Sequence, residues 1–227
     1  MQAVILAAGR GTRMGALTEG TPKVMLEVVG KPLLQHKLDA LPASIDEVVI
    51  VVGYLGGVIH RYFGGEYNGK HILYAEQENP VGGTAEALWK AKGVLEKKFV
   101  VMNGDDLYAA EDIASCTQYE WAMLVQERDP LCTGGKVVTD ARHRIRSIEE
   151  GTHEGKGFIN AGLYVLDTRI FDLPLVPKAA GSAEYGLPQT MMQAAKSIAI
   201  TAVPAHFWLQ ITSPDDLKKA EEILMKV

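Results

Sequence analysis

Two cationic side chains, Arg13 and Lys23, follow a glycine-containing turn at the start of the chain. The apolar run 4–8 before that turn has the pattern of a buried strand. Gly9 and Gly11 then allow the backbone to approach a ligand closely. Because fixed positive charge beside exposed backbone N–H groups suits a polyphosphate, the segment predicts a polyphosphate site where the first strand ends.

A second candidate lies where another apolar run ends, in the sequence Asn103-Gly104-Asp105-Asp106. Magnesium in proteins takes one or two carboxylates and completes its shell with water and phosphate oxygens. Asp105 is therefore the candidate metal ligand. Asp106 has the simpler interpretation of a residue that caps the next turn.

Two common phosphate-binding motifs do not fit the first segment. A P-loop requires Gly-Lys-Ser/Thr after its spacer, and no such triplet follows Gly9 and Gly11. A dinucleotide-binding turn requires a third glycine where Met14 stands, with a helix directly after it. A turn between strand and loop that binds no ligand stays open as the structural alternative.

The elements that would position these residues alternate between strand and helix in the first half of the chain. Buried strands are predicted over 47–53, 71–75 and 99–102, and amphipathic helices over 32–40 and 84–95. This alternation predicts an α/β fold with a mainly parallel sheet and helices on both faces. Ligands of such sheets bind beyond the carboxyl ends of the strands.

The second half has a different pattern. Short polar turns separate the strands predicted over 121–126, 136–139, 144–148 and 158–166, which favours hairpins. Helices are predicted over 182–197 and 214–226. Ser213 or Asp215 is expected to cap the last helix, with Pro214 in its first turn.

Bulk properties narrow the class of protein. The 227 residues are 47% hydrophobic and 22% charged, which suits one well-packed α/β domain. The net charge of −5 disfavours a nucleic-acid partner. No apolar run approaches the roughly 20 residues that cross a membrane. With no leader pattern at the start, a cytoplasmic location is expected. Cys116 and Cys132 show no metal spacing and are expected to be structural.

The first segment resembles the N-terminal motif of the sugar-1-phosphate nucleotidyltransferases. The matching residues run from Leu6 to Met14, then Pro22-Lys23, then Gly30 to Leu33. The resemblance implies a Rossmann-like three-layer α/β/α sandwich with a small β-rich acceptor-binding lobe. Within one domain it implies a nucleotide-binding part over about 1–110 and an acceptor-binding part over about 111–227.

The resemblance also implies roles for individual residues. Arg13, Lys23 and Asp105 would be catalytic, with Asp105 on Mg²⁺. Gln77 and the turn that ends in Gly83-Thr84 would contact a pyrimidine base, although the turn is equally a helix N-cap. The nucleotide-binding set is Leu6, Ala7, Ala8, Gly9, Gly11, Thr12, Arg13, Gln77, Gly82, Gly83 and Thr84.

On the acceptor side the resemblance implies Gly135, Glu150, Asn160 and Glu184. Glu150 stands where the family has glutamate-lysine-proline, but Gly151 and Thr152 follow it here. A lysine contact to the acceptor phosphate is therefore in doubt. Lys156 is a possible substitute, and a solvated turn lysine is its simpler interpretation.

Gln210 stands where the family has its second metal carboxylate. An amide oxygen can coordinate a metal ion but brings no charge, so metal affinity should fall. Three outcomes are open. Asp105 and the triphosphate hold the metal with Gln210 and water, a nearby carboxylate takes over, or the chain binds nucleotide without efficient turnover.

The predicted activity is Mg²⁺-dependent transfer of a nucleotidyl group from a nucleoside triphosphate, with UTP or dTTP favoured, to a sugar 1-phosphate. A cytidylyltransferase that acts on phosphocholine or another non-sugar phosphate is one alternative. A nucleotide-binding regulatory subunit with a weakened metal site, which Gln210 suggests, is the other. The expected partners are these small molecules, with no nucleic acid and no membrane.

Overall fold

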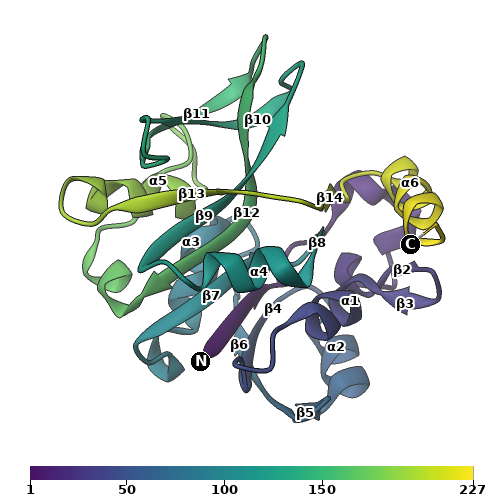
Figure 1. Ribbon diagram of the computed structural model, residues 1–227. Coiled ribbons are helices and arrows are strands. Elements are labelled where there is room, and N and C mark those ends of the chain that lie inside the picture. Colours follow the sequence, from purple (N-terminus) through teal and green to yellow (C-terminus); the bar gives the residue numbers. More distant parts are fainter. Residues whose placement is uncertain (227) are drawn as a thin grey trace.

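The computed structural model describes residues 1–226, and a sheet of ten strands forms its centre. These strands are β1 (Gln2–Leu6), β4 (Glu47–Val52), β5 (Glu66–Tyr67), β6 (Lys70–Glu76), β7 (Lys98–Asn103), β9 (Trp121–Arg128), β10 (Thr133–Thr139), β11 (Ile145–Thr152), β12 (Gly157–Asp167) and β13 (Ile200–Pro204). Their order is β11-β10-β12-β7-β1-β4-β6-β5. In addition, β9 pairs with β12, and β13 pairs with β9 (Figure 1).

The middle of the sheet is parallel. Strand β1 pairs in parallel with β4 on one side and β7 on the other, and β4 pairs in parallel with β6. Strands β1, β4 and β7 contain continuous apolar runs because both of their faces are covered. Successive side chains point to opposite faces, so Val4 and Ile5 enter different hydrophobic clusters.

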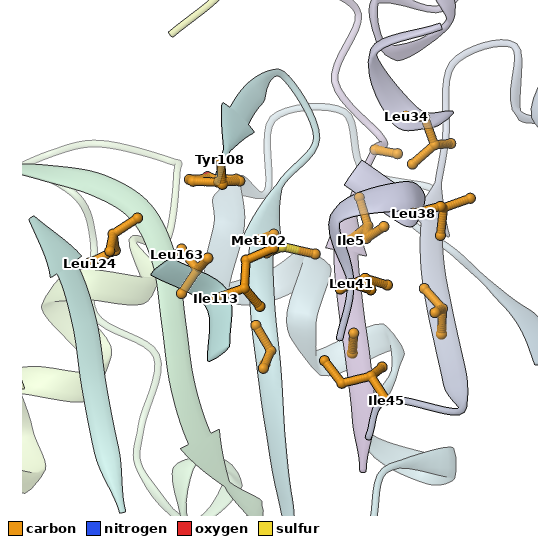
Figure 2. Packing of buried hydrophobic residues seen from close by; sticks show 14 of the residues in the cluster. Ile5, Leu34, Leu38, Leu41, Ile45, Met102, Tyr108, Ile113, Leu124 and Leu163 are labelled. Atoms are coloured by element: carbon orange, nitrogen blue, oxygen red, sulfur yellow. The ribbon is translucent and has the colours of Figure 1, made fainter. Parts of the chain in front are cut away.

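Helices cover both faces of the sheet. Cluster residues on the Ile5 face come from α1 (Leu33–Ala40), α2 (Gly56–Phe63) and α4 (Ala110–Cys116), and Figure 2 shows Leu34, Leu38 and Ile113 among them. The Val4 face is covered by α3 (Gly83–Lys90), α5 (Leu187–Met191) and the 3-10 segment Thr168–Asp172. The predicted three-layer α/β/α sandwich is therefore confirmed.

The second half of the chain extends the same sheet with antiparallel pairs. Strand β12 joins the two halves, since it pairs antiparallel with β7 and also with β9 and β10. Of the hairpins expected between consecutive strands here, β10–β11 forms, and it projects beyond the rest of the sheet (Figure 1). Strands β9 and β10 do not form a hairpin, because each pairs with β12 instead. The division into parts over about 1–110 and 111–227 stays a prediction, and its last residue lies outside the described residues.

Small elements attach the C-terminal helix. Two-stranded ladders pair β2 (Glu27–Val28) with β3 (Lys31–Pro32) and β8 (Asp106–Tyr108) with β14 (Trp208–Gln210). Helix α6 (Pro214–Leu224) has Ser213 as its N-cap and Pro214 in its first turn, so the cap predicted at Ser213 is confirmed. The Asp216 carboxylate accepts hydrogen bonds from the backbone N–H groups of Thr212 and Ser213, both at 2.9 Å.

Two helix predictions need correction. The helix expected over 84–95 ends at Lys90, and Lys92–Val94 forms a separate 3-10 turn. The helix expected over 182–197 begins only at Leu187 and gives way to the 3-10 segment Met192–Lys196. Residues before Leu187 pair instead with the turn that precedes α3, and that tertiary pairing overrides the local helical pattern. The remaining 3-10 segments are Thr12–Thr18 and Lys23–Met25.

Two further expectations concern membrane-spanning segments and the two cysteines. Within residues 1–226, the structure contains no helix with the length and apolar character that crossing a membrane requires. Cys116 is buried, and burial raises the pKa of its thiol to about 12, which fits a structural role. Cys132 is exposed.

Asp112 fixes the chain between β13 and β14. Its side chain is buried on α4, and one oxygen accepts hydrogen bonds from the backbone N–H groups of His206 at 2.9 Å and Phe207 at 3.0 Å. The His206 ring donates to the other oxygen at 2.6 Å, which raises the pKa of His206. Since Gln210 lies a few residues further on, this contact also helps to position the site.

We expect Asp112→Ala to lower the free energy of unfolding by about 1–3 kcal/mol, because two backbone N–H groups lose their acceptor. Urea denaturation measures the change. His206→Ala is the control, since its exposed ring can be lost while the carboxylate still holds both N–H groups. Equal stability of the two variants would contradict this role for Asp112.

Candidate functional site

A cleft of about 510 Å³ lies beyond the carboxyl ends of the parallel strands. Leu6 and Asn103, the last residues of β1 and β7, line it, as does Gln77 directly after β6. This is the edge at which open α/β sheets bind ligands. The residues predicted from the sequence that line the cleft are Leu6, Ala7, Ala8, Gly9, Gly11, Thr12, Arg13, Lys23, Gln77, Gly83, Thr84, Asp105, Gly135, Glu150, Asn160, Glu184 and Gln210. Gly82 is not among the lining residues.

Close packing of backbone at the strand ends forms the floor of the cleft. The N–H of Gly104 donates to the carbonyl of Leu6 at 2.9 Å. A Cβ atom at Gly104 would lie 2.5 Å from that same carbonyl oxygen, so only glycine fits. The loop after β7 is thereby held against the end of β1, and Asp105 follows directly.

Lys23 and Asp105 form an ion pair inside the cleft, with Nζ 2.6 Å from Oδ2. The lysine side chain is 8% exposed and the carboxylate 32% exposed. An ammonium group this deeply buried needs an anionic partner, and Asp105 supplies it. Arg13 lies on the exposed 3-10 segment at the same edge and forms no ion pair among residues 1–226. The cleft thus holds one paired and one unpaired cation on its nucleotide side.

A second lysine and a second aspartate, Lys37 and Asp106, are buried behind this ion pair. Lys37 on α1 donates from Nζ to the backbone carbonyl of Asp106, and both side chains are about 1% exposed. Burial raises the pKa of the Asp106 carboxyl and lowers the pKa of the Lys37 ammonium. The turn-capping role expected for Asp106 is wrong. Its carboxylate accepts hydrogen bonds from Asn103 and Tyr108, both at 3.3 Å, because β8 begins at this residue and turns its side chain inward.

The ladder between β8 and β14 brings Gln210 to this place. Gln210 is the register partner of Asp106, and the N–H of Ile211 donates to the carbonyl of Asp105 at 3.2 Å. Both Asp105 and Gln210 line the cleft. No group of three or more His, Cys, Asp or Glu side chains suited to a metal occurs within residues 1–226. A metal ion in this cleft would be bound by Asp105, by the amide oxygen of Gln210 and by oxygens of water or of a bound phosphate group.

The turn before α3 forms one wall. Gln77 is buried, and its Nε2 donates to the carbonyl of Gly83 at 3.3 Å. Gly83 has a positive φ of 79°, and a Cβ atom there would lie 2.5 Å from the carbonyl oxygen of Tyr185. Helix α3 begins at Gly83 with Gly82 as its N-cap, so this turn also forms a helix N-terminus, without a side-chain cap hydrogen bond.

The segment 176–186, which we term the arm, is hydrogen-bonded to that turn. The N–H of Ala85 donates to the carbonyl of Tyr185, and the N–H of Tyr185 donates to the carbonyl of Gly82, both at 3.0 Å. Just beyond the arm, the N–H of Leu187 donates to the hydroxyl of Thr84 at 3.0 Å. Thr84 therefore joins the nucleotide side of the cleft to the start of α5, directly after the arm.

The opposite wall carries polar side chains from β11 and β12. Asn160 accepts a hydrogen bond from the N–H of Gly162 and donates to the hydroxyl of Tyr164, both at 2.9 Å. The carboxylate of Glu150 accepts a hydrogen bond from Nε2 of Gln189 at 2.9 Å. A Cβ atom at Gly135 would lie 3.1 Å from that carboxylate, so glycine keeps the wall open.

Several lining residues escaped the sequence analysis. They come from the wall and from the arm with the start of α5, and are Thr133, Tyr164, Lys178, Tyr185, Gly186, Pro188 and Gln189. Within the arm the family resemblance indicated only Glu184, and the helical pattern expected from residue 182 onward gave no sign of a cleft wall. Lys156, the possible substitute for a missing lysine, forms an exposed ion pair with Glu127 at 2.9 Å and does not line the cleft.

The chain belongs to the nucleotidyl transferase family, whose profile matches residues 2–226. It is 32% identical to the UTP–glucose-1-phosphate uridylyltransferase AglF of Haloferax volcanii over 100% of this chain and 97% of that protein. It is 31% identical to the bifunctional protein GlmU of Methanocaldococcus jannaschii over 99% of this chain. The chain spans 54% of that second relative.

A solved structure shows the same fold. HddC from Yersinia pseudotuberculosis superposes with a TM-score of 0.76 at 26% identity, over 98% of this chain and 99% of HddC. The fold and the family predicted from the sequence are therefore confirmed, whereas the roles of the individual cleft residues stay predictions.

Replacing Gly83 by alanine should disturb the junction between turn and arm. We expect Gly83→Ala to lower the free energy of unfolding by more than about 1 kcal/mol, because its φ is positive and the new Cβ meets the backbone of Tyr185. Gly57→Ala is the matched control. Gly57 lies on α2, and a Cβ atom there meets only the Arg61 side chain at 3.5 Å. Thermal unfolding measures the stability of both variants. Equal stability of Gly83→Ala and Gly57→Ala would contradict this role for Gly83.

Proposed function

We propose that the protein is a Mg²⁺-dependent nucleotidyltransferase that joins a nucleoside triphosphate, UTP or dTTP, to a sugar 1-phosphate. The products are a nucleotide sugar and pyrophosphate. The observation that carries the proposal is the place of the Lys23–Asp105 pair, in one cleft with the Gln77–Gly83 wall and with the wall that carries Glu150. The similarity to a UTP–glucose-1-phosphate uridylyltransferase supports the same class of substrates.

The reaction needs no nucleophile from the protein. An oxygen of the acceptor phosphate attacks the α-phosphorus of the triphosphate, a new P–O bond forms, and the bond to the bridging oxygen of the leaving pyrophosphate breaks. Catalysis then consists of aligning two polyanions and stabilising the charge that develops between them. Neither Cys116 nor Cys132 lines the cleft, in agreement with direct transfer.

The cationic side chains divide this work. Arg13, with its planar guanidinium fork, would bridge oxygens of adjacent phosphates in the triphosphate. Lys23 would contact the reacting phosphates. Its present partner, Asp105, holds the ammonium group in place before the substrates arrive. The ammonium group would therefore need little reorganisation when a phosphate replaces or joins that carboxylate.

The donor set fits Mg²⁺. Asp105 is a partly exposed carboxylate on the cleft wall, and Gln210 supplies a neutral oxygen beside it. With a single carboxylate among these ligands, most of the coordination shell would come from water and phosphate oxygens, as is usual for this ion. When bound, Mg²⁺ would neutralise phosphate charge during transfer.

The amide of Gln77 can recognise a pyrimidine base. One amide proton of Gln77 is used by the carbonyl of Gly83, while its second amide proton and its Oε1 can both contact a base. The N3–H group of uracil or thymine would donate to Oε1, whereas N3 of cytosine would accept the amide proton. The preference for UTP or dTTP therefore rests on the similarity to a UTP–glucose-1-phosphate uridylyltransferase.

A nucleotide-binding subunit without turnover is the second candidate, and Gln210 is the observation that favours it. Pyrophosphate release separates the two. The assay pairs UTP, dTTP, CTP, GTP and ATP with glucose, N-acetylglucosamine and mannose 1-phosphates and with phosphocholine, in the presence of Mg²⁺. We expect turnover with UTP or dTTP and a sugar 1-phosphate. Turnover only with CTP and phosphocholine, or nucleotide binding with no turnover in any pair, would contradict the proposal.

The proposed metal role of Asp105 predicts a large loss of activity. Asp105→Asn should lower kcat by about 100- to 1,000-fold, the effect of removing one group that stabilises charge at the transition state. Asp215→Asn is the control, because Asp215 is exposed on α6 and lies outside the cleft. A rate near wild type for Asp105→Asn would refute the metal role.

Gln210 predicts a change in the opposite direction. Gln210→Asp would restore a second carboxylate beside Asp105, so less Mg²⁺ should be needed for half-maximal rate. A magnesium titration of the initial rate measures this. Gln118→Asp adds the same charge on an exposed part of the chain outside the cleft and serves as control. Superimposable titrations for Gln210→Asp and wild type would exclude Gln210 from the metal site.

A further inference from the structure

The acceptor side of the cleft has one cation that no sequence motif indicated. A phosphate monoester brings up to two negative charges, which charge-assisted hydrogen bonds must compensate. The cationic side chains that line the cleft within residues 1–226 are Arg13, Lys23 and Lys178. The first two belong to the nucleotide side, and Lys23 is already paired with Asp105. Of these three cationic side chains, only Lys178 belongs to the arm.

The backbone of Lys178 is held on two sides. Its N–H donates to the carbonyl of Glu184 at 2.8 Å, and the N–H of Gly186 donates to the carbonyl of Val176 at 3.0 Å, so the two ends of the arm form a short ladder. The N–H of Val176 also donates to the hydroxyl of Thr190 on α5 at 3.1 Å. Through Tyr185 the arm is bonded to the turn before α3. The lysine therefore extends from a fixed point over the cleft.

The side chain of Lys178, in contrast, is held loosely. Its Nζ lies 4.0 Å from the nearest carboxylate oxygen of Glu184, and both side chains are 52% exposed. An exposed pair at this distance contributes little to stability. A phosphate group, with more charge and several acceptor oxygens, can replace that carboxylate at small cost.

Lys156 is the other lysine that could be considered, and its environment excludes it. It pairs with Glu127 at 2.9 Å, outside the cleft. Glu150 is followed by Gly151 and Thr152, and neither of these two residues carries a charge.

We propose that Lys178 binds the phosphate of the acceptor and thereby selects a phosphorylated acceptor over its neutral counterpart. This inference rests on the proposed function, and it assigns the acceptor-phosphate contact to the arm.

The test is steady-state kinetics in which each substrate is varied in turn, with UTP and glucose 1-phosphate as the probes. Lys178→Gln should raise KM for glucose 1-phosphate by about tenfold or more, the loss expected for a hydrogen bond to a charged group. The KM for UTP should not change. Lys178→Arg should recover most of the loss, and Lys156→Gln, the matched control, should behave as wild type.

A purely structural role for Lys178 would move both KM values together, and that result would overturn the inference. An unchanged KM for glucose 1-phosphate would also overturn it. Calorimetric titration with glucose 1-phosphate needs no turnover and separates this inference from the proposed function. If the wild type binds glucose 1-phosphate but shows no activity, the proposed function fails while weaker binding by Lys178→Gln still supports the inference. No binding to the wild type, or equal binding by both, contradicts it.

Discussion

The ion pair between Lys23 and Asp105 is the constraint on which the site depends. A lysine as buried as Lys23 is unfavourable without an anion, and the nearest carboxylate comes from a loop far away in sequence. The two meet because β1 and β7 are neighbours and because Gly104 lets the loop after β7 contact the end of β1. The parallel pairing of the sheet thus becomes a fixed charge arrangement at its carboxyl edge.

A second constraint connects the two sides of the cleft. The turn at Gly82–Ala85 and the arm share backbone hydrogen bonds through Tyr185, and Gly83 allows the close approach. The wall that we assign to the base and the arm that carries Lys178 are therefore joined directly through the backbone. In a transfer between two bound polyanions, such a connection fixes their relative positions, and a large part of the barrier depends on those positions.

Much of the nucleotide side could be predicted from the sequence. Asp105 lies just after β7, where the strand pattern and the rule of carboxyl edges place it. Arg13 and Lys23 lie on 3-10 segments further from β1, and it was their charge after the glycine-containing turn, together with the family motif, that indicated them. The arm could not be predicted in the same way. Residues 182–186 have a local pattern compatible with a helix, and it is their hydrogen bonds with a turn about a hundred residues earlier that hold them in a non-helical conformation.

The turn-capping prediction for Asp106 was wrong for a related reason. Two adjacent aspartates look alike in sequence, and the difference between them arises from β8 and β14, a short ladder between distant segments. That ladder buries Asp106 beside Lys37 and leaves Asp105 facing the cleft. It also brings Gln210 next to Asp105, which the family resemblance alone had indicated.

The most direct test of this account is a crystal structure of the protein with Mg²⁺ and a UTP analogue that cannot be cleaved between its α- and β-phosphates. The account predicts the α-phosphate beside Lys23, the metal ion on Asp105 and the base against Gln77 and Gly83. A nucleotide bound elsewhere, or one whose phosphates lie away from the Lys23–Asp105 pair, would contradict it.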